Sequence, residues 1–135
     1  MNKVKTTYEK VFNFIAGANL YLKANEEETK LKYAIERTGE KVNLVTKEYQ
    51  QKLQDLRLEH AYSDDKGKVP FTIAQNGERE YEYTKEGLKA LDKAIEDLFK
   101  SEVEVEVYYT TELPDGLDEG FKNLFKGFVI DEVQN

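Results

Sequence analysis

The sequence has few of the residues on which catalytic and metal chemistry depends. Among its 135 residues there is no cysteine and a single histidine, His60. Without cysteine there is no disulfide, thiolate metal site or thiol nucleophile, and a reducing compartment is favoured. A zinc site built on several imidazoles, or a Ser/His/Asp system with a second supporting histidine, is also excluded. We therefore expect a protein that is not an enzyme and that binds no metal or other cofactor.

Long hydrophobic runs are also missing. The first ten residues, MNKVKTTYEK, lack the apolar run of a secretory signal. No apolar run approaches the ~20 residues that a membrane-spanning helix requires. These absences predict a soluble, cytoplasmic protein with no membrane partner.

Basic residues are scarce in the second half of the chain. Residues 1–60 carry 11 basic and 9 acidic side chains, whereas residues 61–135 carry 9 basic and 18 acidic ones. From Ser101 onward only Lys122 and Lys126 oppose nine carboxylates, so this part would repel a phosphate backbone. Direct binding of nucleic acid is not expected.

The first half of the chain shows the period of helices. Apolar residues from Val4 to Leu22 recur at steps of three and four, which predicts a helix beginning near Thr6 or Thr7. A second helix, capped by Asn25, is expected to run to about His60 or Tyr62. Unbroken, it would measure ~50 Å, against ~35 Å for a compact domain of this size. Either it bends or breaks near Thr38-Gly39, or its far half projects and needs a partner to cover it.

The second half changes to the period of strands. Two alternating segments flank Asn76-Gly77, which predicts a β-hairpin with a type I′ turn. Thr84 can cap a third helix ending at Phe99, and a strand and a short helix at residues 118–125 follow. We expect a β-α-β unit in a small mixed sheet whose buried face lies under the third helix and carries Val69, Phe71, Ile73, Tyr81, Tyr83, Val103, Val105 and Val107.

These elements predict one α+β domain, residues 1–135. It would consist of a helical arm, residues 1–62, and a small lobe, residues 63–135, with a β-hairpin, a helix, a strand and a short C-terminal helix.

The densest group of reactive side chains lies in SEVEVEVYY, residues 101–109, where Glu102, Glu104 and Glu106 alternate with valines. A half-buried strand turns every second residue to water, so a solvated face explains the three glutamates. A calcium or magnesium site would need closing ligands that the sequence lacks, and an acid/base pair would need burial. One ring of Tyr108-Tyr109 must lie on the glutamate side, which makes it a candidate contact residue.

The order of elements in the last two thirds of the chain resembles that of a family of small, uncharacterised bacteriophage and prophage proteins. The similar stretch, residues 59–117, is EHAYSDDKGKVPFTIAQNGEREYEYTKEGLKALDKAIEDLFKSEVEVEVYYTTELPDGL. Shared features are a long charged helix, an Asp-rich turn with glycine, a short strand segment, a helix and a Val/Glu strand before a Leu-Pro turn. The resemblance implies a viral origin and a helical arm with a small sheet, and it implies no catalytic residues.

These observations together predict a non-enzymatic interaction or assembly protein, encoded by a phage and forming homo-oligomers or binding another protein. Its contact residues would lie on the far half of the arm and on the acidic C-terminal surface: Tyr49, Leu53 and Leu56, then Glu102, Glu104, Glu106, Tyr108, Asp115, Asp118 and Glu119.

Two alternatives remain open. One is an inhibitor that imitates the charge of nucleic acid and occupies a basic groove of a host protein. The other is a binder of a nucleotide-like small ligand, with a pocket between sheet and arm and with Tyr and Lys as contacts.

Overall fold

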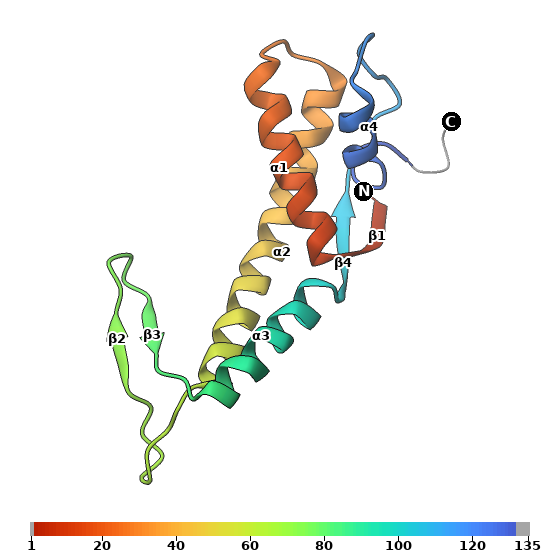
Figure 1. Ribbon diagram of the computed structural model, residues 1–135. Helices are drawn as coiled ribbons and strands as arrows, with labels where there is room; N and C mark the ends of the chain where they lie inside the picture. Colours follow the sequence, from red (N-terminus) through yellow and green to blue (C-terminus); the bar gives the residue numbers. More distant parts are fainter. Residues whose placement is uncertain (1, 132–135) are drawn as a thin grey trace. The chain divides into compact units, whose positions relative to one another are not determined.

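The computed structural model describes residues 2–131 of the chain. In this part of the chain eight elements follow one another: β1 (Asn2–Thr7), α1 (Tyr8–Ala24), α2 (Lys30–His60), β2 (Phe71–Ile73), β3 (Arg79–Tyr81), α3 (Lys85–Phe99), β4 (Glu102–Val107) and α4 (Glu119–Phe125). The predicted α+β class and the long second helix are confirmed (Figure 1). None of the helices described combines the length and the apolar character needed to cross a membrane.

The chain divides into two compact units. Unit 1 comprises Met1–Lys47 and Lys100–Asn135, and unit 2 comprises Glu48–Phe99. α2 contributes its first part to unit 1 and the remainder to unit 2. These bounds differ from the expected arm and lobe, and the single domain of residues 1–135 stays a prediction.

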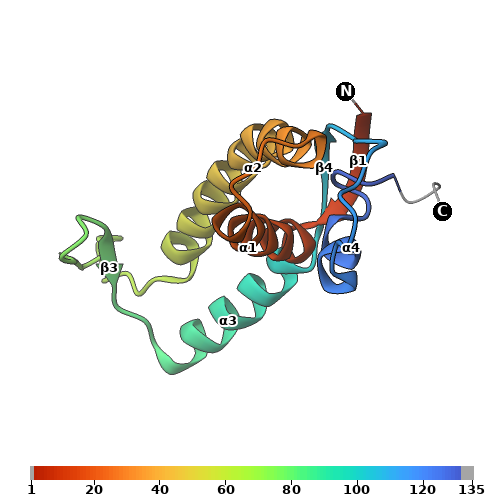
Figure 2. The same cartoon turned by 90° about the horizontal axis from the view of Figure 1, so that it is seen from above.

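Unit 1 combines a two-stranded sheet with α1, the first part of α2 and α4. Seen from above, α1 and α2 lie side by side, with the strands and α4 next to them (Figure 2). Its buried apolar side chains come from all of these elements and from the segment after α4: Tyr8, Val11, Phe14, Ala18, Tyr21, Leu31, Ala34, Ile35, Val42, Val45, Val105, Val107, Phe125, Phe128, Val129 and Ile130.

The sheet of unit 1 pairs β1 with β4 in antiparallel orientation. This corrects the expectation of a mixed sheet in which the β4 segment would join the hairpin. The register sets Val4 opposite Val105, and it sets Lys3 and Lys5 opposite Glu106 and Glu104. Opposite charges facing each other across strands favour this register over a slip by one residue, which would also expose the valines. β1 was missed because Val4 also fits the helical spacing that continues into α1.

α1 begins where the sequence predicts, with Thr7 as its cap accepting the Lys10 N–H at 3.2 Å. Its middle packs closely on α4: a Cβ added at Gly17 would lie 2.6 Å from Cδ1 of Leu124. Phe14 meets the C-terminal segment, with its ring stacked on Phe128 at 4.7 Å between centroids. Because Gly17 has no side chain, Leu124 of α4 can pack closely against α1.

α2 continues without interruption through Thr38-Gly39 and is about 46 Å long at 1.5 Å per residue. Thr38 is fully buried, and its Oγ1 accepts the Tyr108 N–H at 2.9 Å. The same hydroxyl lies 3.4 Å from the carbonyl oxygens of Tyr108 and Phe128, to which it can donate. Because the polar partners of Thr38 lie outside the helix, the residue joins α2 to the end of β4 and to the C-terminal segment without breaking α2.

In unit 2, α3 packs against the second part of α2 (Figure 1). The Tyr49 and Phe99 rings meet edge to face at 6.4 Å, and Leu53 and Leu91 are buried. At the start of α3, a Cβ added at Gly87 would lie 2.9 Å from the backbone oxygen of His60. The expectation that α3 covers a sheet is therefore wrong: α3 covers a helix.

The residues expected beneath α3 are distributed over both units. Val105 and Val107 are buried in unit 1, whereas Phe71 and Ile73 are exposed on the hairpin of unit 2. The alternation of apolar and polar residues identified the strands, but it could not identify which element covers each apolar face.

The β2–β3 hairpin is confirmed, but its turn differs from the predicted type I′. That turn needs a positive φ at both central residues, and of the two only Gly77 has one, +84°. Ala74 accepts the Gly77 N–H at 2.9 Å and donates its own N–H to the Glu78 carbonyl at 2.8 Å. The turn thus has three residues between Ala74 and Glu78, with Gly77 in the left-handed conformation.

Replacing Thr38 by valine should lower the free energy of unfolding by about 1–3 kcal/mol, because the partly buried hydrogen bond from the Tyr108 N–H loses its acceptor at nearly constant side-chain volume. Urea unfolding followed by circular dichroism measures the change. Thr46→Val is the matched control on the same helix, since its hydroxyl donates to the Asn43 carbonyl at the surface. The control should shift stability by less than about 0.5 kcal/mol. Equal effects of the two variants would contradict the role given to Thr38.

Gly87→Ala and Gly39→Ala should change stability in opposite directions. At Gly87 the new methyl group meets the His60 carbonyl oxygen, and overpacking of this kind costs about 1–3 kcal/mol. At Gly39 nothing lies within 4 Å, so alanine should add about 0.5–1 kcal/mol through its better helix propensity. Thermal unfolding of both variants checks the signs, and a stabilised Gly87→Ala would show that the two chain segments do not approach so closely.

Candidate functional site

The glutamates of β4 lie on the face of the sheet that is in contact with water. Glu102 and Glu104 are exposed and Glu106 is half-buried. Lys3 Nζ lies 3.8 Å from Glu104 Oε1, and Lys41 Nζ lies 3.3 Å from Glu106 Oε2. Within residues 2–131, no three Asp, Glu or His side chains come together as a metal ion would require. Of the three β4 glutamates predicted as contact residues, two thus pair with lysines of their own unit.

The remaining acidic contact residues lie near α4. Asp118 caps that helix by accepting the Gly120 N–H at 2.6 Å, and Glu119 Oε1 lies 3.2 Å from Lys122 Nζ. Asp115 is exposed in the preceding turn, which has Gly116 at a φ of +75°. The structure therefore assigns local structural contacts to Asp118 and Glu119, and a role of these residues toward a partner stays a prediction.

The apolar contact residues of the expected arm are covered within unit 2. Tyr49 and Leu53 are buried by the packing of α3, and Leu56 is half-buried. Burial raises the pKa of Tyr49, and the Arg57 charge partly opposes this shift. The expectation of an uncovered stripe on a projecting helix is wrong for Tyr49 and Leu53, because α3 takes the place of the external partner. Their role in self-association stays a prediction.

A shallow pocket of about 560 Å³ in unit 1 contains Tyr108, the remaining predicted contact residue. It lies between the start of α2 and the segment after β4, and it is lined by Glu28, Thr29, Lys30, Tyr33, Tyr108, Tyr109, Thr110 and Thr111. The Tyr33 and Tyr108 rings meet edge to face, with centroids 5.4 Å apart and planes at 86°. Tyr33 is 49% exposed and Tyr108 36%, so parts of both rings are open to a ligand.

Two cations lie at this tyrosine pocket. The Arg37 guanidinium carbon is 5.9 Å from the centroids of both rings, within the range of a cation–π contact. Lys30 Nζ is 2.9 Å from Glu112 Oε1, and this hydrogen bond raises the pKa of Lys30. Chemically, the pocket offers ring faces to a planar group and two nearby cations to an anion. Tyr33 was not identified from the sequence, where it is one aromatic residue on a charged helix.

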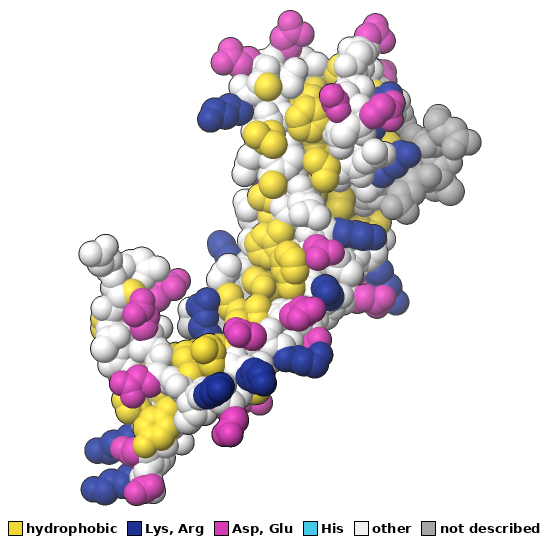
Figure 3. Space-filling model, in the orientation of Figure 1, with side chains coloured by type: hydrophobic (Ala, Val, Ile, Leu, Met, Phe, Trp, Pro, Cys, Tyr) yellow, Lys and Arg dark blue, Asp and Glu magenta, His cyan; other side chains and the backbone are white. Residues whose placement is uncertain are grey.

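The second candidate is the β2–β3 hairpin of unit 2. The register places Phe71 opposite Tyr81 and Ile73 opposite Arg79, so these four side chains share one face. Phe71 is 46% exposed and Ile73 61%, although the Arg79 guanidinium lies 4.5 Å from the Phe71 ring centroid. In the space-filling view, hydrophobic side chains reach the surface of unit 2 among acidic and basic ones (Figure 3). The hairpin thus presents apolar groups that its own unit leaves uncovered.

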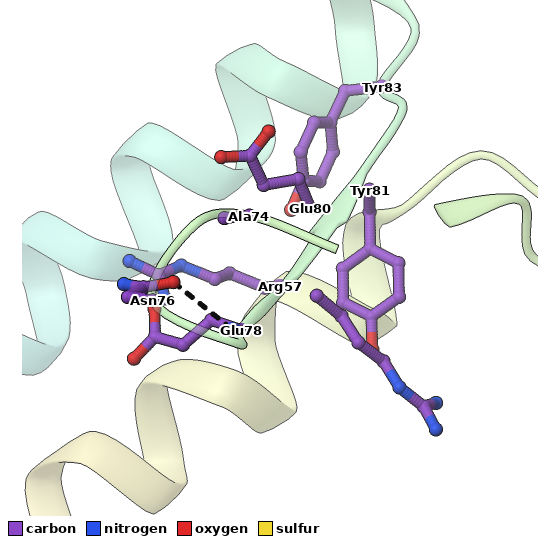
Figure 4. Close-up of a pocket in the computed structure, with 8 residues that line it drawn as sticks. Arg57, Ala74, Asn76, Glu78, Glu80, Tyr81 and Tyr83 are labelled. Atoms are coloured by element: carbon purple, nitrogen blue, oxygen red, sulfur yellow. Dashed lines mark hydrogen bonds between the residues drawn. The ribbon is translucent and has the colours of Figure 1, made fainter. Parts of the chain in front are cut away.

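The side of the hairpin formed by β3 faces α2. A cavity of about 360 Å³ lies there, lined by Arg57, Ala74, Asn76, Glu78, Arg79, Glu80, Tyr81 and Tyr83 (Figure 4). Most of these residues belong to β3 and its flanks, and none belongs to β2. Burial raises the pKa of Tyr83, against the opposing charge of Arg57. β2 is therefore the outer strand of the hairpin.

The outer strand differs from the inner one in charge. The eight residues 69–76, VPFTIAQN, contain no charged side chain in a chain that is 35% charged. Residues 78–82, EREYE, contain four. Natural sheets protect exposed edges with charged side chains, with very short strands or with proline. β3 carries the charges, whereas β2 carries none and is a strand of three residues that follows Pro70. We call residues 69–76 the β2 edge; an uncharged segment in so charged a sequence was the signal that could have identified it.

No protein-family model, curated protein or solved structure matches the chain significantly. The tyrosine pocket and the β2–β3 hairpin are therefore the two surfaces that indicate a function.

Proposed function

We propose that this protein is a non-catalytic interaction protein that binds an extended strand of another polypeptide along the β2 edge. The observation that carries this proposal is the exposure of Phe71 and Ile73 on a strand whose free side bears no charge. Strand addition of this kind takes affinity from main-chain hydrogen bonds and specificity from the alternate side chains.

The stability of the hairpin supports the same conclusion. An isolated two-stranded hairpin is marginally stable in water, and three or more strands are needed for independent stability. In the described residues β2 and β3 form a sheet of two strands, each of three residues. A third strand on the β2 edge would complete the ladder and cover part of the exposed apolar face.

Site-specific photo-crosslinking tests the proposal. With p-benzoylphenylalanine at position 73, the full chain should form a crosslinked adduct with another polypeptide, either in producing cells or after purification. Position 44 is the matched control, because Leu44 is 60% exposed and Ile73 61%, and Leu44 lies in unit 1. The mass of the adduct identifies the partner.

If the contact depends on the hairpin, the crosslink should also depend on it. The adduct should disappear when Thr72→Pro is added, since the Thr72 N–H belongs to the ladder between β2 and β3. Equal yields at positions 73 and 44, no adduct at 73, or an adduct that survives Thr72→Pro would each overturn the proposal.

A second function, binding of a small planar anion such as a nucleoside monophosphate, is favoured by the tyrosine pocket. Its support is the proximity of Tyr33 and Tyr108 to Lys30 and Arg37. The volume of the tyrosine pocket, about 560 Å³, also lies within the range of small-ligand sites. The ion pair of Lys30 with Glu112 is exposed on both sides and therefore weak enough to exchange for a ligand anion.

Adenosine monophosphate should raise the melting temperature by several degrees at about a hundred times its dissociation constant, since saturation at that level adds about 2.7 kcal/mol. Tyr108→Ala should abolish the increase by removing one ring face. Tyr62→Ala, a control at an exposed tyrosine of unit 2, should leave it unchanged. No increase for the wild type, or equal increases for both variants, would exclude this site.

A further inference from the structure

We infer that the polypeptide bound at the β2 edge is a second copy of this chain, and that two β2 strands pair antiparallel about a two-fold axis at Thr72. This inference depends on the proposed function, because it names the partner of that surface. It predicts a four-stranded sheet in the order β3, β2, β2 of the second copy, β3 of the second copy.

The backbone of β2 has the required free groups. Ala74 donates to Glu78 across the hairpin, and bonded positions alternate in an antiparallel ladder. The next bonded position is therefore Thr72, opposite Glu80. Phe71 and Ile73 direct their N–H and C=O groups away from β3, to the side where no strand of the described chain lies.

When two β2 strands pair about Thr72, the outward N–H and C=O groups of both Phe71 and Ile73 find partners. Phe71 of one copy lies opposite Ile73 of the other, and each such pair can exchange two N–H···O bonds. A shift by one residue would place the outward groups of one copy opposite a residue whose own groups bond to β3. The alternation therefore excludes registers shifted by an odd number of residues. Of the remaining ones, the register centred on Thr72 is the one in which both outward residues of the three-residue strand pair with strand residues of the other copy.

The side chains fit the same arrangement. A two-fold axis perpendicular to the sheet keeps the apolar faces of both copies on one side. Phe71 and Ile73 then form two aromatic–β-branched pairs, which are favourable across strands. The opposite face carries the two Thr72 side chains side by side, and Thr–Thr pairs are also favourable. Phe71 and Ile73, which are 46% and 61% exposed in one copy, are then partly covered by the same two residues of the other copy.

Charge is compatible with this partner along the edge and opposes it at longer range. The β2 edge has no charged residue, so two copies bring no like charges together across the new pair. Each chain carries a net charge of −7, and the copies therefore repel each other until salt screens them. Added salt should strengthen the association, whereas a contact held by ion pairs would weaken.

Sedimentation velocity on the full chain from about 10 µM to about 1 mM tests the inference, since a contact of this size is expected to be weak. The wild type should pass from monomer to dimer. Ile73→Pro should remain monomeric, because it removes an outward N–H that the hairpin does not use. Protection of the Thr72 and Ala74 amides from exchange would show that the hairpin is retained.

Charge reversal at the axis gives a test specific to self-pairing. Thr72→Lys and Thr72→Glu should each weaken the dimer about two- to fivefold, because like charges then lie directly opposite each other. An equal mixture of the two variants should associate more strongly than either alone. Thr72→Lys also faces Glu80 of its own hairpin, so loss of the hairpin cannot explain its weaker dimer.

A wild type that stays monomeric at every concentration, a dimer insensitive to Ile73→Pro, or a mixture that associates no better than its components would each overturn the inference. Failure here can be distinguished from failure of the proposed function. A crosslinked adduct at position 73 with a different polypeptide would keep the interaction role and exclude the second copy as the partner.

Discussion

The apolar stripe of α2 is the constraint on which both compact units depend. A helix of 31 residues presents more apolar surface than α1, with 17 residues, can cover. The chain solves this with two different partners: α1 and the β1–β4 sheet cover the first part in unit 1, and α3 covers Tyr49 and Leu53 in unit 2. Thr38 adds a directional contact, since its hydroxyl meets backbone groups of Tyr108 and Phe128.

The two units differ in how far their surface groups find partners within the unit. In unit 1, Glu104 and Glu106 of β4 pair with lysines of β1 and α2, and Asp118 caps a helix. These carboxylates have partners in their own unit, which weakens the case for an acidic surface that imitates nucleic acid. In unit 2 the outer strand of the hairpin has exposed apolar side chains, bears no charged side chain, and has no strand beside its outer edge within residues 2–131.

Several features of the fold were accessible from the residues themselves. The period of three and four residues located α1, the alternation located β4 and the hairpin, and Thr84 caps α3 as predicted by accepting the Gly87 N–H at 3.0 Å. The predicted cap of α2 was wrong: Thr29 accepts the Lys32 N–H, whereas Asn25 ends α1 and donates to the Tyr21 carbonyl. Two of the errors, the missed β1 and the wrong turn type, share one cause. Val4 fits both a helical and a strand period, and the turn at Gly77 depends on the φ of Asn76, which Asn can adopt with either sign. Local signals that are compatible with two geometries are decided by the contacts of the folded chain.

The sequence by itself determined the class of the fold, the position of most elements, and which side of β4 meets water, because these depend on propensity and period within a few residues. Tertiary structure alone decided that β4 pairs with β1, that α3 covers a helix, and that Tyr33 and Tyr108 meet across 75 residues of chain. An apolar face specifies that it must be covered and does not specify by what. That choice depends on the distances between segments remote in sequence, which exist only once the chain has folded.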